Sequence, residues 1–110
     1  MPASDLIKKT ATEMVSLLKS GEVTPLDCLD ALEARIPEVE PAVNALPTLC
    51  FERAREAAKA LMAKPVAERG LLAGLPVAIK DLLNVKGVRS TQGSPIYADL
   101  IPDASDLTVT

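Results

Sequence analysis

The stretch Gly74–Asp81 constrains this chain more than any other. It reads Gly-Leu-Pro-Val-Ala-Ile-Lys-Asp, so a short apolar run bounded by glycine leads directly into a lysine. A run of this length and composition predicts a short β-strand that can be covered on both faces. At the end of such a strand a lysine loses hydration, which disfavours its ammonium form and lowers its pKa toward the range of a general base. We therefore predict a buried strand that ends in a functional amine, Lys80.

Two interpretations of this lysine stay open at the level of pattern alone. Lysines at strand ends commonly extend their flexible stem into water, and Lys80 would then only favour solubility. Asp81, the next residue, should point to the opposite face of the strand. We expect its carboxylate to anchor the loop that follows rather than to act on the lysine directly.

A hydroxyl-rich loop follows at Ser90–Pro95, after a turn predicted at Lys86-Gly87. This composition is typical of a capped turn, in which hydroxyls bond to nearby backbone groups. The alternative is that its hydroxyls and amides hold the lysine amine in place, as preorganised sites require. Thr91 and Ser94 are the candidates for that role, together with Asp81.

Residues 10–64 are predicted to be mainly helical. Thr10–Glu13 forms a capping-box sequence, and Gly21 supplies a left-handed stop, which predicts a helix near residues 11–20. A second helix should begin at Thr24-Pro25, where the missing N–H of proline costs nothing, and should run to about Ile36. We expect Pro37 to end it.

The second half of the helical region is less regular. Residues 37–47 contain three prolines and predict a connector, with a short strand over residues 44–49. An alanine-rich helix is predicted over residues 51–63, with its alanine face against a sheet and Arg55 on the solvated side. On the preceding helix, Asp30 and Glu33 are likewise expected to be solvated.

Composition excludes several classes of function. The chain has 110 residues and no histidine, so Ser-His-Asp and Cys-His arrangements cannot be built from it and another base is needed. Cys28 and Cys50 form no metal-binding pair, so we expect reduced, partly buried thiols, and neither a metal nor a cofactor. Aromatic residues make up only 2%, Phe51 and Tyr97, so a core must be built from smaller apolar side chains.

Charge and hydropathy bear on the possible partners. The net charge is −3 with dispersed cations, which argues against a nucleic-acid partner. No apolar run approaches the length of about 18 residues that spans a bilayer, and we expect no membrane partner. The sequence therefore predicts a cytoplasmic protein.

Four segments, in this order and spacing, resemble the amino-terminal part of the amidase signature family: Gly74–Asp81, Val85–Val88, Ser90–Ser94 and Pro102–Asp106. A weaker likeness extends back to about Thr10. In that family a Gly-Ile/Val-Pro-x-x-Val/Ile-Lys-Asp strand carries the lysine of a Ser, cis-Ser, Lys triad, and a Gly-x-x-Thr-Thr-x-Gly-Ser loop follows. The sequence departs from this pattern at Ser90 and Leu82-Leu83. Neither departure touches Lys80.

The resemblance implies an α/β fold in which residues 1–110 supply the amino-terminal helices and the first strands of a mixed sheet. Residues 10–64 would be the helical part, and residues 74–106 the strand with Lys80 and its hydroxyl-rich loop. It further implies hydrolysis of a small-molecule amide through an acyl-enzyme. The two serines of the triad would lie beyond Thr110, because the chain has no Gly-Gly-Ser-Ser-Gly run.

On this interpretation the chain alone is an inactive amino-terminal fragment, incomplete as a domain, whose partner is the remainder of an amidase. Two alternatives stay open. The chain could be a non-catalytic helix and strand module that binds a partner through its apolar surface. It could also belong to one subunit of an amidotransferase.

Overall fold

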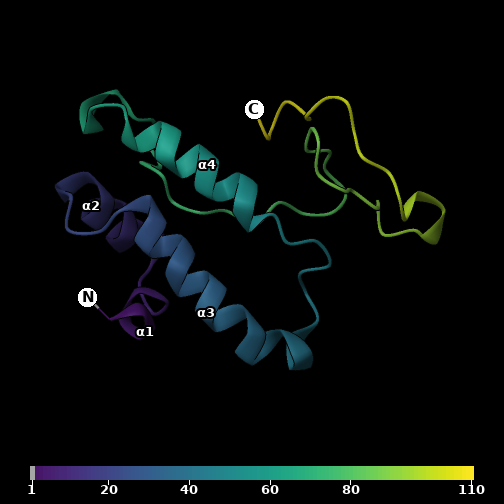
Figure 1. The fold of residues 1–110 in the computed structure, drawn as a ribbon, viewed down its shortest axis with the longest axis horizontal. Coiled ribbons are helices and arrows are strands. Elements are labelled where there is room, and N and C mark those ends of the chain that lie inside the picture. Colours follow the sequence, from purple (N-terminus) through teal and green to yellow (C-terminus); the bar gives the residue numbers. More distant parts are fainter. Residues whose placement is uncertain (1) are drawn as a thin grey trace. The chain divides into compact units, whose positions relative to one another are not determined.

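A computed structural model describes residues 2–110 of the chain (Figure 1). Contacts divide it into two units, with the boundary between Pro76 and Val77. The described part of the first unit contains helices α1 (Ala3–Leu6), α2 (Ala11–Ser20), α3 (Pro25–Val43) and α4 (Phe51–Met62), and a 3₁₀ turn, η1 (Val66–Glu68). The second unit contains a 3₁₀ turn, η2 (Pro95–Tyr97), and an isolated antiparallel bridge between Val85 and Val88.

The start and end of α2 agree with the sequence prediction. The Thr10 hydroxyl accepts a hydrogen bond from the Glu13 backbone N–H at 3.3 Å, and the Glu13 carboxylate accepts from the Thr10 N–H at 2.7 Å. Gly21 ends the helix with φ +79°. These interactions join residues no more than four positions apart, so the local sequence is sufficient to specify them.

The predicted end of α3 at Pro37 is wrong. The helix begins at the Thr24 cap as predicted, but it continues through Pro37 and Pro41 to Val43. The Glu40 carboxylate accepts hydrogen bonds from the backbone N–H groups of Ala45 (2.5 Å) and Leu46 (2.7 Å), while Asn44 adopts the left-handed conformation. This cap satisfies the backbone beyond the last turn and fixes the helix end there. The connector predicted over residues 37–47 is therefore shortened at its start and begins at Asn44, and the strand predicted over residues 44–49 is not formed.

Helix α4 confirms the predicted helix over residues 51–63, but its surroundings differ from the prediction. It packs against α3 and not against a sheet. Arg55 bridges the two helices: its guanidinium contacts Asp30 at 2.8 Å and also pairs with Glu33. The Asp30 and Glu33 face of α3, which the sequence predicts to be only solvated, is therefore an ion-paired helix contact.

The core of the first unit is small and contains no aromatic side chain, as predicted. The core cluster consists of Leu6, Met14, Leu18, Val23, Cys28, Ala31 and Ala73. Leu29 of α3 and Ala58 of α4 are also buried, outside this cluster. Leu18 is only 1% exposed and is the largest fully buried side chain among the described residues. Leu6 belongs to α1, a helix that the sequence did not predict, and its burial holds α1 against α3.

The strand predicted at Gly74–Lys80 is not formed in this structure. The unit boundary falls within that stretch, and residues 75–80 have no regular secondary structure. Val77 is 59% exposed and Ile79 is 42% exposed, so the run is not buried. A strand needs a neighbour to complete its hydrogen bonds, and residues 2–110 offer none here. The structure is helix-rich, consistent with part of an α/β domain.

Inside the first unit, the chain leaves the core through two residues in left-handed conformations. Ala73 is buried and has φ +53°, and Gly74 has φ +101°. A Cβ at Gly74 would lie 2.5 Å from Cγ of Pro25 and 3.1 Å from Cδ2 of Leu61. Only glycine fits there, because both the backbone conformation and the space exclude a side chain.

We predict that Gly74→Ala destabilises the chain by about 2–4 kcal/mol, because it combines backbone strain with overpacking against Pro25. Urea unfolding followed by far-UV circular dichroism measures this change. Gly70→Ala is the matched control, since nothing lies within 4 Å of its Cβ position, and it should change stability by less than about 0.5 kcal/mol. Equal effects of the two substitutions would contradict the packing argument.

Candidate active site

Lys80 lies at the start of a turn in the second unit. Its carbonyl oxygen accepts a hydrogen bond from the Leu83 N–H at 2.9 Å, which closes the turn over residues 80–83. The side chain is exposed. Within residues 2–110, no hydrogen bond or ion pair engages its amine, so the predicted dry environment is not provided by this chain. The reason is the missing sheet: neither face of the segment before Lys80 is covered.

Asp81 anchors the hydroxyl-rich loop, as the sequence predicted. Its Oδ1 accepts a hydrogen bond from the Thr91 N–H at 2.8 Å, and its Oδ2 accepts from the Thr91 hydroxyl. Its backbone carbonyl accepts a third bond, from the Gln92 N–H at 3.0 Å. We call the paired side chains of Asp81 and Thr91 the clasp. It joins residues ten positions apart directly beside Lys80.

The clasp changes the ionisation of Asp81. The Thr91 hydroxyl, followed by the Thr91 backbone N–H, stabilises the carboxylate, and the charge of Arg89 adds a smaller effect. Together they outweigh the opposing effect of burial and hold the pKa of Asp81 below its ordinary value. Asp81 is therefore a carboxylate at neutral pH, which makes its hydrogen bonds charge-assisted.

A second set of hydrogen bonds joins Gln92, Asn84 and Asp106 across the same loop, and we call it the second strap. The sequence did not predict it. The Gln92 side-chain amide donates to Oδ1 of Asn84 at 2.8 Å, and the Asn84 N–H donates to Oδ2 of Asp106 at 2.7 Å. The Asp106 N–H returns a bond to the Asn84 carbonyl at 3.0 Å. No local signal could reveal it, because Asn84 and Asp106 are 22 positions apart.

The two serines of the loop have local roles. Ser90 is 2% exposed, and its hydroxyl donates to the Val88 carbonyl at 3.1 Å. Ser94 caps η2 by accepting a hydrogen bond from the Ile96 N–H at 3.3 Å. The interpretation of this loop as a capped turn is therefore correct for Ser94, whose hydroxyl bonds to a nearby backbone N–H. Of the three candidates for supporting Lys80, the structure brings the side chains of Asp81 and Thr91 together. Ser94 is joined to Thr91 through the backbone alone, where its N–H donates to the Thr91 carbonyl at 2.9 Å.

The second unit is held together by these polar contacts rather than by an apolar core. Its buried residues are Ser90 and Pro102. Further backbone bonds link Gly87 to Pro102 and Ser90 to Leu100, each at 3.0 Å. Its large apolar side chains are mostly exposed, and they include Val77, Ile79, Leu82, Ile96, Ile101 and Leu107.

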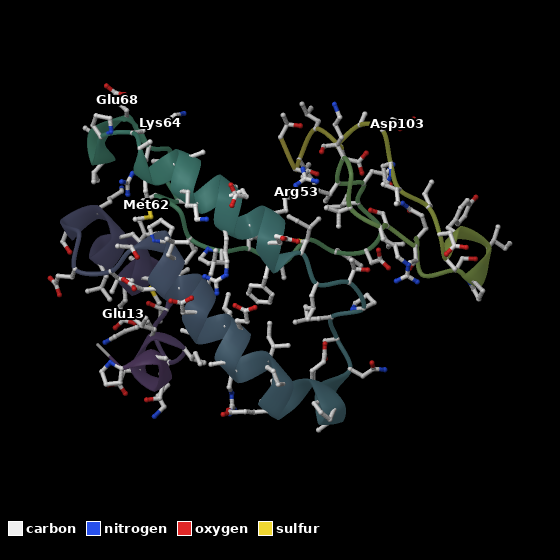
Figure 2. The ribbon with its side chains drawn as sticks, in the orientation of Figure 1. Glu13, Arg53, Met62, Lys64, Glu68 and Asp103 are labelled. Atoms are coloured by element: carbon white, nitrogen blue, oxygen red, sulfur yellow. The ribbon has the colours of Figure 1, made fainter. Side chains whose placement is uncertain are left out.

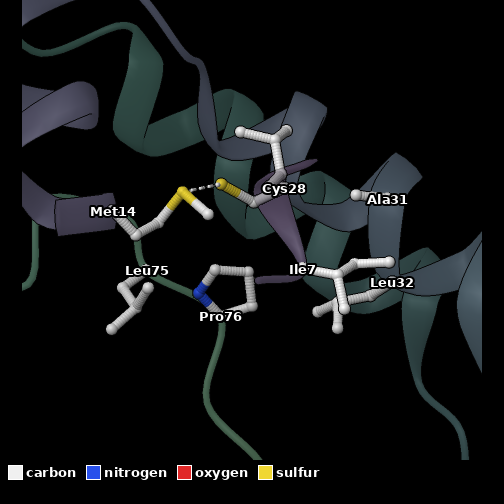
Figure 3. Close-up of a pocket in the computed structure, with 8 residues that line it drawn as sticks. Ile7, Met14, Cys28, Ala31, Leu32, Leu75 and Pro76 are labelled. Carbon is white, nitrogen blue, oxygen red and sulfur yellow. Dashed lines mark hydrogen bonds between the residues drawn. The ribbon is translucent and has the colours of Figure 1, made fainter. Parts of the chain in front are cut away.

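A separate apolar pocket lies within the first unit and contains none of the candidate residues. It has a volume of about 150 Å³ and is lined by side chains that include Leu6, Ile7, Leu32 and Leu75 (Figure 3). Sγ of Cys28 contacts Sδ of Met14 at 3.5 Å on its wall. Burial raises the pKa of the Cys28 thiol, with a smaller contribution from Asp27, whereas Cys50 is exposed, contrary to prediction.

Comparison with known proteins assigns the class. The sequence profile of the family described as Amidase matches residues 27–110, a range that includes Lys80, the clasp and the second strap. The chain belongs to the amidase family. No helix among residues 2–110 is long and apolar enough to cross a membrane.

Individual relatives share one name, the A subunit of glutamyl-tRNA(Gln) amidotransferase. The chain is 37% identical over 105 residues to the protein of this name from Shouchella clausii, covering 94% of this chain and 22% of that protein. It is 40% identical over 111 residues to the Streptomyces coelicolor protein, covering 97% of this chain and 22% of that protein. For the Roseiflexus sp. protein the identity is 38% over 94 residues, covering 84% and 19%. The chain thus spans about a fifth of the length of these relatives.

We predict that the clasp opens in acid. Because the pKa of Asp81 is lowered on folding, its contribution to stability is present above the pKa of the unfolded carboxyl, about 4. The contribution is lost as the pH falls through the lowered pKa. An NMR titration of the Thr91 amide should report this transition, and Asp81→Asn should abolish it.

Asp103→Asn is the control for this titration, since Asp103 is exposed and lies in the same unit (Figure 2). That variant should keep the transition of the wild-type chain. A Thr91 amide resonance that stays constant from neutral pH into strong acid would contradict the assignment of the bond to Asp81.

Proposed function

We propose that this chain supplies the catalytic lysine, Lys80, of an enzyme that cleaves carboxylic amides through an acyl-enzyme. One observation carries the proposal: in a chain of the amidase family, the matched region includes a lysine whose amine forms no hydrogen bond or ion pair within residues 2–110. Its neighbour Asp81 is bonded to a hydroxyl-rich loop. An uncommitted amine is available to accept a proton from a group supplied by further protein.

The mechanism follows from the family resemblance. A neutral Lys80 takes a proton from a bridging serine, which takes the proton of a nucleophilic serine as that serine attacks the amide carbonyl. Backbone N–H groups stabilise the oxyanion, the protonated Lys80 returns its proton through the bridging serine to the leaving nitrogen, the amine leaves, and water hydrolyses the ester. The bridging and nucleophilic serines are proposed to come from a Gly-Ser-rich segment that is not among these 110 residues. Residues 1–110 alone are therefore proposed to be inactive.

The remainder of an amidase is the proposed partner that completes the site. Val77, Ile79 and Leu82, which flank Lys80, are 59%, 42% and 52% exposed, so they offer apolar surface for it to cover. Covering them would also remove water from around the lysine, and desolvation favours the neutral amine that can accept a proton. The same contact could supply the neighbouring strands that residues 74–80 lack.

A second, narrower candidate places the chain in an amidotransferase. It is favoured by the relatives, which carry the name of the A subunit of glutamyl-tRNA(Gln) amidotransferase. In that case the ammonia released by the amidase reaction would be passed to a glutamyl group on tRNA. The net charge of −3 leaves unchanged our prediction that this segment itself does not bind nucleic acid, and a cytoplasmic location remains part of the proposal.

The test uses a complete enzyme. It is either a longer natural chain that contains these residues or a hybrid in which they replace the aligned segment of the Shouchella clausii protein. Lys80→Ala should lower amide hydrolysis by about 10²–10⁴-fold, the usual contribution of a general base. Ammonia release from a primary amide such as glutamine provides the assay. Lys64→Ala is the control, since Lys64 is an exposed lysine just beyond α4 (Figure 2).

Normal turnover of the Lys80→Ala enzyme would overturn the proposal and favour the non-catalytic module. A fluorophosphonate probe provides an independent check on the 110-residue chain, which should remain unlabelled. Stoichiometric labelling of one of its serines would show that the nucleophile is present after all. Transfer of the amide nitrogen to glutamyl-tRNA(Gln) separates the amidotransferase candidate from a free amidase.

A further inference from the structure

The peptide that carries Lys80 is fixed by interactions of its neighbour, not of the lysine itself. Lys80 is exposed, whereas Asp81 and Thr91 are both half-buried. Asp81 uses both carboxylate oxygens and its carbonyl to bind residues 91 and 92, while the Lys80 carbonyl closes the turn with Leu83. Lys80 therefore extends from a backbone that is restrained on its carboxyl-terminal side.

We propose that the clasp of Asp81 and Thr91 positions Lys80 for catalysis by fixing the backbone from which the lysine extends. This inference rests on the proposed function of Lys80. It assigns to Asp81 and Thr91 a positioning role without contact to the amine or to substrate. It differs from the expectation that the loop hydroxyls hold the amine, because the hydroxyl hydrogen of Thr91 is donated to Asp81.

Two features suit the clasp to this role. Its hydrogen bonds involve an ionised acceptor, and such bonds are shorter and roughly twice as strong as neutral ones. Lysine also has a long and flexible side chain, so the position of its amine depends on how well the backbone at Lys80 is fixed. A displacement of about 1 Å at a reacting group can cost about 10²-fold in rate.

The second strap supports the clasp through Gln92, the residue next to Thr91. Gln92 has φ +55°, a left-handed conformation that costs free energy for a residue other than glycine. Its N–H binds the Asp81 carbonyl and its side chain binds Asn84, which is joined in turn to Asp106. These bonds hold the Thr91-Gln92 pair in the geometry that places both Thr91 donors on the Asp81 carboxylate.

The first arm of the test measures amide hydrogen exchange in the 110-residue chain. Thr91→Val keeps the size and branching of the side chain but removes the hydroxyl donor. We expect it to increase the exchange rate of the Leu83 amide, which bonds to the Lys80 carbonyl, by at least about tenfold. Thr108→Val makes the same chemical change at an exposed threonine of the same unit and should leave that rate unchanged.

The second arm measures kinetics in the complete enzyme described above. Thr91→Val should lower kcat by about 10- to 100-fold and change KM by less than about threefold, because the substrate still binds while the base is misplaced. Thr91→Ser, which restores the hydroxyl, should return kcat to within about threefold of wild type.

The outcomes separate this inference from the proposal on which it rests. An unchanged Leu83 exchange rate in Thr91→Val overturns the clasp as a positioning device, whatever the activity. A large effect of Lys80→Ala combined with normal kcat in Thr91→Val also overturns it, while the proposed function survives. If Lys80→Ala is fully active, the proposed function itself fails. An equal loss in Thr91→Val and Thr91→Ser would point to a packing defect and would contradict the clasp.

Discussion

The bond between the Asp81 carboxylate and Thr91 is the interaction on which the second unit depends. Residues 77–110 bury Ser90 and Pro102 but no large apolar side chain, so the usual source of stability for a folded segment is nearly absent. Hydrogen bonds to charged groups generally contribute more to stability than bonds between neutral groups. The Asp81 carboxylate accepts two such bonds from one residue and is thus a major restraint on the unit, alongside the bond from the Asn84 N–H to the Asp106 carboxylate.

The contrast between the two units connects stability with the proposed role. The first unit has a core of leucine, methionine, valine, cysteine and alanine side chains, and Arg55 joins α4 to α3 through Asp30 and Glu33. The second unit holds the candidate residues on a hydrogen-bonded frame and leaves its apolar side chains exposed. Such a surface is typical of a segment that is buried by other protein. An exposed Lys80 is consistent with a base whose environment is completed by that protein.

Interactions between near neighbours were predicted well from the sequence. The capping box at Thr10, the left-handed Gly21 and the Thr24-Pro25 start of α3 are all where the sequence places them. The sequence also predicted that Asp81 anchors the loop, but not that Thr91, ten positions away, is its partner. Prediction failed where a competing interaction lay outside the local pattern. Pro37 predicts a stop, but the Glu40 cap three residues later moves the end of α3 to Val43. The pattern around Arg55 predicts a solvated side chain. It does not reveal the ion pair with Asp30, because that partner lies on another helix.

The sequence by itself determined the starts of α2, α3 and α4, the lysine at position 80 and the family to which the chain belongs. These follow from residue chemistry and short-range spacing, which do not depend on the rest of the fold. Only the tertiary structure decided that Thr91 bonds to Asp81, that Asn84 links Gln92 to Asp106, and that residues 74–80 form no strand. The two hydrogen-bonded links require groups that are distant in the chain to meet. The strand is not formed because a strand has no hydrogen-bonded ladder until a neighbouring strand supplies one.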